Sequence, residues 1–114
     1  MNLQKVIEQL ELDCLTEPVD FGSVDLTFGY ASDMLSCVMT GAQHGSLWVT
    51  LVSSLNIVAV ASLLELPAVI ITEGARPDQD TLTRANQQGI TLLSTPLGSF
   101  EVIGRLWEMG LRGQ

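Results

Sequence analysis

Hydroxyl, glycine and charged residues recur directly after the apolar runs that we predict to be strands. In an open parallel sheet the carboxyl ends of the strands meet at one edge, where such sheets bind their ligands. Most of these residues also open a predicted helix, whose unpaired N–H groups favour an anion such as phosphate or carboxylate. Arg76 is the guanidinium nearby that could pair with the anion. The residues predicted at this edge are Ser32, Asp33, Ser53, Ser54, Asn56, Thr72, Gly74, Arg76, Ser94, Thr95 and Ser99.

The same residue types also cap helices when no ligand is present. A Ser, Thr, Asn or Asp side chain accepts a hydrogen bond from the first turn of the helix and contributes about 1 kcal/mol. The sequence therefore leaves two interpretations open, namely helix caps alone or a small-ligand site.

An enzyme is the alternative that the reactive side chains suggest. His44, the single histidine, lies in a polar turn beside Gly45, where an ordinary surface residue is expected. Asp33 or Cys37 could act with His44, but no motif supplies the third group that would orient the pair. One histidine, two separated thiols and scattered carboxylates also make no recognisable metal-ligand set. We therefore predict neither a metal nor a cofactor.

The elements that position these residues alternate between strands and helices through the second half of the chain. Short connections between them predict β-α-β units, and hence an α/β fold with a mainly parallel sheet. The predicted strands are 12–15, 24–30, 47–52, 68–72 and 91–94. The predicted helices are 2–10, 34–41, 55–64, 78–88 and 98–109, with Gly89 as a left-handed residue after the fourth.

The composition predicts one acidic domain in the cytoplasm. The chain has 114 residues, with 13 acidic against 5 basic side chains and a formal net charge of −8. This charge argues against general binding to nucleic acid or anionic membranes, which requires a basic surface. The apolar stretch 57–71 is too short and too interrupted to span a bilayer. Two cysteines this far apart, Cys14 and Cys37, favour reduced thiols, with a disulfide as the alternative.

The predicted helix 55–64 lacks the polar face that a surface helix normally keeps. It is therefore either central in the domain or covered by a partner, and the closing helix could extend the same surface. The residues predicted for a dimer interface are Leu55, Val58, Leu63 and Trp107.

Several segments in a fixed order carry a family resemblance that extends over nearly the whole chain. They are Asp25–Asp33, Gly45–Thr50, Asn56–Ala61, Ile70–Gly74, Gly89–Pro96 and Ser99–Glu101. In this order they resemble the DRTGG domain family. Asp25, Thr27 and Gly29 match the motif that names the family, while Leu26 replaces its arginine and Phe28 its first glycine.

The resemblance implies a single three-layer α/β/α domain over residues 1–114, with a non-catalytic regulatory or assembly role and frequent dimerisation. It adds Thr27 and Gly29 to the ligand-binding candidates. It also suggests a partner from a redox or hydrogenase system. An adenine nucleotide is a further candidate for the small anionic ligand. The family is similar to the N-terminal domain of HPr kinase/phosphorylase, but this chain has no GxxxxGK[ST] loop for a nucleotide triphosphate.

Three hypotheses follow from these observations. The first is a homodimeric regulatory domain that binds a small anionic metabolite or nucleotide. The second is the small enzyme that uses Asp33 or Cys37 with His44. The third is a purely structural adaptor, which would bind a protein partner and respond to no ligand.

Overall fold

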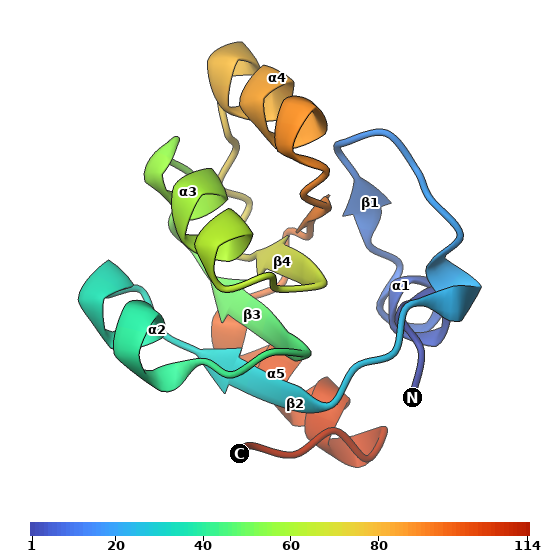
Figure 1. Ribbon diagram of the computed structural model, residues 1–114. Helices are drawn as coiled ribbons and strands as arrows, with labels where there is room; N and C mark the ends of the chain where they lie inside the picture. The colour runs from blue at the N-terminus through green and yellow to red at the C-terminus, as the bar shows by residue number, and fades with distance from the viewer.

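A five-stranded sheet with helices on both faces forms the framework of the protein (Figure 1). The computed structural model describes residues 1–114. In the strand order β1-β5-β4-β3-β2, strands β2 to β5 run parallel and β1 pairs antiparallel with β5. The strands are β1 (Asp13–Cys14), β2 (Phe28–Ala31), β3 (Ser46–Thr50), β4 (Ala68–Ile71) and β5 (Leu92–Ser94). The helices are α1 (Leu3–Leu10), the short 3-10 helix η1 (Phe21–Ser23), α2 (Leu35–Gly41), α3 (Asn56–Leu63), α4 (Gln79–Gln88) and α5 (Ser99–Glu108).

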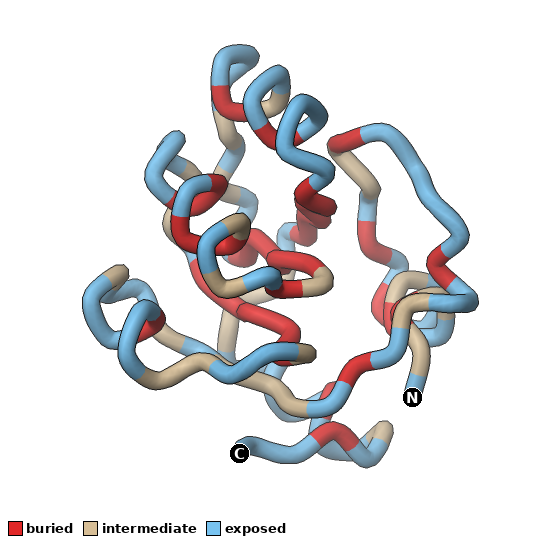
Figure 2. The backbone as a smooth tube through the Cα atoms, in the orientation of Figure 1, coloured by how far each residue is buried: buried red, intermediate tan, exposed pale blue.

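The side chains of the central strands contribute to two apolar layers, because successive residues of a strand point to opposite faces. On β3, Leu47 and Val49 pack with residues of α1 and α5, whereas Trp48 packs with residues of α2, α3 and α4. Strands β3, β4 and β5 are buried along their whole length, as in parallel sheets covered on both faces (Figure 2). The predicted three-layer α/β/α domain with a mainly parallel sheet is therefore confirmed.

Helix α3 has apolar residues on nearly all of its sides because it packs between α2 and α4. Ile57, Val58 and Ala61 are buried against the sheet layer, at 1% exposure or less. Only the outer side of the helix region remains accessible, with Leu55 at 44% and Leu63 at 67% exposure. The predicted interface residue Val58 is thus a core residue. Because α5 lies on the other face of the sheet, its Trp107 does not extend the surface of α3.

The segment before β2 differs from the prediction. A strand was expected over 24–30, but β2 begins only at Phe28. The preceding residues follow the start of α1 instead: the Leu3 N–H donates to the Val24 carbonyl, and the Leu26 N–H donates to the Met1 carbonyl, both at 2.9 Å. Leu26 is 6% exposed and belongs to the α1 and α5 core. The apolar alternation therefore reflects burial against α1 and not pairing with β3.

The start of α4 provides a prediction about stability and pH. Asp78 caps the helix by accepting from the Thr81 N–H at 2.9 Å, and these Thr81 contacts hold the pKa of the Asp78 carboxyl below its usual range. A depressed carboxyl pKa stabilises the fold above the unfolded-state pKa, and this stabilisation is lost as pH falls through the folded-state pKa. We expect Asp78→Ala to lower the Tm by a few degrees at pH 7, and by less in acid.

Thermal unfolding followed by circular dichroism between pH 7 and pH 2.5 measures this difference. Asp80→Ala is the matched control, because Asp80 lies in the first turn of the same helix without the capping bond. An equal loss for Asp78→Ala at both ends of the pH range would contradict the role of the charged cap.

Candidate functional site

The carboxyl ends of β2, β3 and β4 are joined by a chain of side-chain hydrogen bonds. The Asp33 carboxylate, just after β2, accepts from the Thr50 hydroxyl and from the Leu51 N–H, each at 2.9 Å. The Thr72 hydroxyl, just after β4, lies 3.3 Å from the Thr50 carbonyl and donates to it. Of the two interpretations left open for Asp33, the helix cap does not form, because its carboxylate joins the ends of two neighbouring strands. The N-cap of α2 is Met34, which makes no side-chain cap bond.

The same chain continues into the start of α5. The hydroxyls of Thr72 and Ser99 lie 2.6 Å apart, and the Ser99 N–H donates to the Glu73 carboxylate at 2.9 Å. Glu73 has a left-handed backbone, with φ 62°, which turns the chain after β4. Its carboxylate therefore takes up an N–H group that was predicted to be open to a ligand anion. Sequence reasoning missed Glu73, because its side chain acts on a helix that begins 26 residues later.

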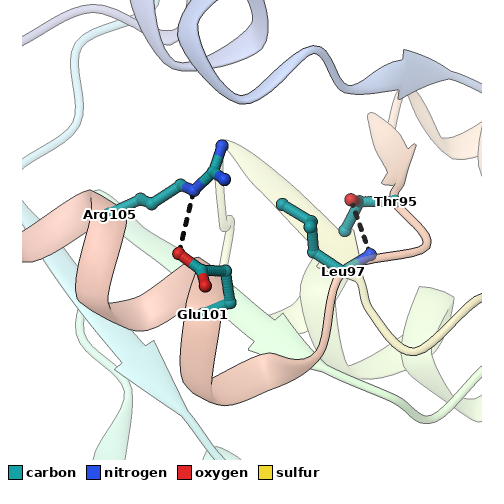
Figure 3. Close-up of polar contacts among 4 residues, drawn as sticks. All are labelled: Thr95, Leu97, Glu101 and Arg105. Carbon is teal, nitrogen blue, oxygen red and sulfur yellow. Dashed lines mark hydrogen bonds and ion pairs between the residues drawn. The ribbon is translucent and has the colours of Figure 1, made fainter.

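A polar cleft of about 200 Å³ lies at the carboxyl ends of β4 and β5. Its lining combines several residues predicted from the sequence with one from the edge strand β1. Its residues are Asp13, Gly74, Ala75, Arg76, Ser94, Thr95 and Pro96, and we name it the β4–β5 cleft. Figure 3 shows one of these residues, Thr95, whose hydroxyl accepts from the Leu97 N–H at 3.1 Å in the turn toward α5.

The two charged side chains of the β4–β5 cleft are Arg76 and Asp13. The ion pairs of the structure join His44 to Glu65 and Arg105 to Glu101, so the Arg76 guanidinium has no carboxylate partner. Asp13 comes from a two-residue strand that pairs with Ser94. Sequence reasoning missed Asp13 because a strand this short leaves no alternation to recognise. The cleft thus offers one free cation, one anion and hydroxyl groups.

The other candidates at this edge lie outside the β4–β5 cleft. Ser32 and Asp33 follow β2, at the far side of the sheet, where the Ser32 carbonyl accepts from the Trp48 indole N–H at 2.9 Å. Ser53 lies between β3 and α3, and Asn56 is the first residue of α3. Ser53 and Ser54 do not cap α3, since its N-cap is Leu55, which makes no side-chain cap bond. The structure therefore does not gather all the predicted residues in one site.

The motif residues Thr27 and Gly29 lie at the opposite end of the sheet. Thr27 directly precedes β2, and Gly29 is its second residue. The Thr27 N–H donates to the Gly45 carbonyl, and the Gly29 N–H donates to the Arg112 carbonyl, both at 2.9 Å. Gly29 also lines a separate, mostly apolar pocket of about 190 Å³ beside α5. These two residues consequently position the start of β2 and do not contribute to the β4–β5 cleft.

No hydrogen bond or ion pair joins the residues of the enzyme alternative. His44 precedes β3 and pairs with Glu65, 3.5 Å from Nδ1 to the carboxylate. Asp33 follows β2, so the parallel strands place it at the other end of the sheet from His44. The Cys37 thiol contacts the Met34 sulfur at 3.6 Å. The pairing that this alternative requires is therefore not formed.

Other features of the chain bear on the classes of site considered above. Cys14 and Cys37 are both free thiols, and no group of three or more metal-binding side chains comes together. None of the helices combines the length and the apolar composition that crossing a membrane requires.

Comparison with known proteins found a matching family and a solved structure with a similar fold. The sequence model described as the DRTGG domain matches residues 28–109. A crystal structure of the CBS and DRTGG domains from the regulatory region of Clostridium perfringens pyrophosphatase, in complex with the activator diadenosine tetraphosphate, is similar with a TM-score of 0.68. At 17% identity the alignment covers 97% of this chain and 47% of that chain, so the present chain spans about half its length. Comparison with curated protein sequences found no match.

Proposed function

Because this chain belongs to the DRTGG domain family, we propose that residues 1–114 form one cytoplasmic, non-catalytic regulatory domain that binds a small anionic ligand in the β4–β5 cleft. The observation that carries the proposal is Arg76, which lines this cleft and whose guanidinium has no ion-pair partner. In a chain with a formal net charge of −8, an anion needs such a local cation in order to bind.

The dimensions of the β4–β5 cleft limit the size of the ligand. Pockets for drug-sized molecules usually measure about 300–1,000 Å³, whereas this cleft measures about 200 Å³. It suits one phosphate or a small carboxylate. An adenine nucleotide would place a phosphate there and leave its base outside. Asp13, which also lines the cleft, favours a ligand that carries a hydrogen-bond donor as well.

We expect ligands of this class to raise the Tm of the wild-type domain, because a ligand that binds only the folded state stabilises it by mass action. Inorganic phosphate, small dicarboxylates, AMP, ATP and diadenosine tetraphosphate are the probes for a thermal-shift experiment. Arg76→Ala should lower the affinity for whichever probe stabilises the wild type about ten- to a hundredfold, since hydrogen bonds to charged groups contribute about 1.5–3 kcal/mol. Asp13→Asn should strengthen phosphate binding by removing a nearby negative charge.

Arg84→Ala is the matched control, because Arg84 is an exposed arginine on α4 that does not line the β4–β5 cleft. If Arg76→Ala and Arg84→Ala respond to a probe in the same way as wild type, that probe binds elsewhere and this placement of the site is wrong. A wild-type domain that responds to none of the probes would remove the small-anion proposal.

We further propose that the regulatory domain acts as a homodimer. Exposed apolar side chains on the helices support an interaction surface, since large apolar patches on a domain usually mark binding sites. Leu55, Leu63 and Trp107 remain candidates by their exposure. The same exposed side chains favour the structural adaptor as the second candidate function, which predicts partner binding without any ligand response. A partner from a redox or hydrogenase system stays a prediction of the resemblance.

A further inference from the structure

Three polar side chains of the β4–β5 cleft have no hydrogen-bond or ion-pair partner in the protein. The Arg76 guanidinium and the Asp13 carboxylate belong to neither ion pair of the structure and make no hydrogen bond. Ser94 is only 5% exposed, and its hydroxyl makes none either. Because no fully enclosed polar side-chain atom lacks a partner, this hydroxyl is accessible, and Ser94 lines the cleft. Polar side chains this deeply placed normally have a partner, so the Ser94 hydroxyl indicates a group that binds in the cleft.

The order of the strands places Ser94 between the two charges. Strand β5, which ends at Ser94, lies between β1 and β4. Asp13 on β1 is the antiparallel partner of Ser94, and side chains opposed in this way lie on the same face, with Cβ atoms about 4.5–5.5 Å apart. Arg76 belongs to the segment that follows β4, on the other side of β5. The cleft thus has an anion from one neighbouring strand, a cation from beyond the other and a hydroxyl between them.

We propose that the ligand of the β4–β5 cleft is a free α-amino acid. Its carboxylate pairs with the Arg76 guanidinium, whose fork of N–H donors fits a carboxylate. Its ammonium group donates to the Asp13 carboxylate, which as an ion can only accept. The Ser94 hydroxyl, which both donates and accepts, contacts the ligand between these charges. This inference rests on the proposed function and names the class of ligand that its site binds.

A ligand with both charges suits the cleft better than a simple anion does. Phosphate would pair with Arg76 but bring its negative charge near Asp13, in a chain whose formal net charge is −8. An amine without a carboxylate would be repelled by Arg76 in the same way. An α-amino acid gives each charge its counterpart and so leaves neither of them desolvated and unpaired. The cleft volume of about 200 Å³ is below the range of drug-sized pockets, as a ligand of this size requires.

Ligand analogues test the two charges separately. The common α-amino acids are first screened by thermal shift against the wild-type domain, since a ligand of the folded state raises its Tm. For each amino acid that binds, isothermal titration then compares it with its N-acetyl derivative, which lacks the ammonium charge, and with its amide, which lacks the carboxylate. Each blocked analogue should bind about ten- to a hundredfold more weakly, because it loses one charged hydrogen bond.

Variants assign each ligand charge to its side chain. Asp13→Asn should bind the amino acid no better than the N-acetyl derivative, while its affinity for phosphate rises, so the two ligands respond with opposite signs. Arg76→Ala should likewise abolish the difference between the amino acid and its amide. Asp20→Asn removes the same charge at an exposed position outside the cleft, where the side chain caps no helix. This control should bind the amino acid and phosphate as the wild type does.

Ser94→Ala separates ligand binding from stability. Without ligand its Tm should stay close to that of the wild type, because the hydroxyl has no partner in the protein. It should bind the amino acid about two- to tenfold more weakly, through the loss of one neutral hydrogen bond. A lower ligand-free Tm together with unchanged affinity would contradict the contact between Ser94 and the ligand.

The failure of this inference differs from the failure of the proposed function. If phosphate or a dicarboxylate raises the Tm through Arg76 but no amino acid does, the site binds simple anions and the amino-acid class is overturned. If an amino acid binds equally well after N-acetylation and in Asp13→Asn, it binds as an anion alone, with the same consequence. A domain that responds to neither amino acids nor simple anions removes the proposed site and this inference together.

Discussion

Replacing Gly45 with alanine is expected to destabilise the domain by roughly 2–4 kcal/mol, combining a backbone penalty with a steric one. Gly45 has φ 81°, in the left-handed region that residues with a Cβ avoid. A Cβ at this position would lie 3.0 Å from Cβ of Thr27 and closer still to its hydroxyl. Thr27 cannot move away freely, because its N–H donates to the Gly45 carbonyl at 2.9 Å. The substitution should therefore distort the segment that leads into β2.

Gly89→Ala separates the two contributions. Gly89 also has a positive φ, 69°, but an added Cβ would meet no heavy atom within 4 Å. Gly89→Ala should therefore lower the free energy of unfolding by only about 1 kcal/mol, which is the backbone penalty alone. Urea unfolding of both variants gives the difference, and Thr27→Ala should recover part of the loss in Gly45→Ala. Equal losses for Gly45→Ala and Gly89→Ala would show that the close approach to Thr27 has no energetic effect.

Gly45 also illustrates what the sequence could predict about the motif. The resemblance drew attention to Thr27 and Gly29 as ligand-binding candidates, but their contacts are internal, to Gly45 and Arg112. Leu26, at the position where the family name has arginine, is 6% exposed in the core. In this chain the motif thus orders the start of an edge strand. Sequence alone could not show this, because these contacts join segments distant along the chain.

The predicted strands and helices agree well with the structure where apolar residues recur at a regular spacing along the chain. The runs around β3 and β4 and the stripe of α5 were placed within a few residues, since their periodicity reports the faces of an element. Strand β1 was predicted only as a longer run, over 12–15, because its two residues are defined by pairing with β5. The segment before β2 was wrongly predicted as part of the strand. Its alternation of apolar and polar residues arises from contacts with the start of α1 and not from strand pairing.

The candidate site was predicted in part, for a topological reason. Parallel strands bring their carboxyl ends to one edge, and this placed Gly74, Arg76, Ser94 and Thr95 together in the β4–β5 cleft. The order of the strands decided which candidates meet, and it placed Ser32 and Asp33 at the far side of the sheet. The pattern of hydroxyl groups also could not reveal that Glu73 already binds the start of α5. This is why we propose the anion in the β4–β5 cleft and not at the start of α5.

Trp48 is the residue whose removal should cost the most. Its side chain is 0% exposed, packs with α2, α3 and α4, and donates from the indole N–H to the Ser32 carbonyl at 2.9 Å. We expect Trp48→Ala to destabilise the domain by about 3–5 kcal/mol, a large part of the 5–15 kcal/mol that typically stabilises a domain. Trp48→Phe should destabilise the domain less, because phenylalanine fills most of the space. The remaining loss arises because the Ser32 carbonyl no longer has its hydrogen-bond donor.

Urea unfolding monitored by circular dichroism measures these losses, with Phe100→Ala as the control at a 94% exposed aromatic residue. That control should change the free energy of unfolding by no more than about 1 kcal/mol, because the Phe100 side chain buries little area. Trp48→Phe should keep its phosphate response, because the β4–β5 cleft lies across the sheet from Ser32. If Trp48→Ala and Phe100→Ala proved equally stable, the packing of the α2, α3 and α4 layer around Trp48 would be wrong.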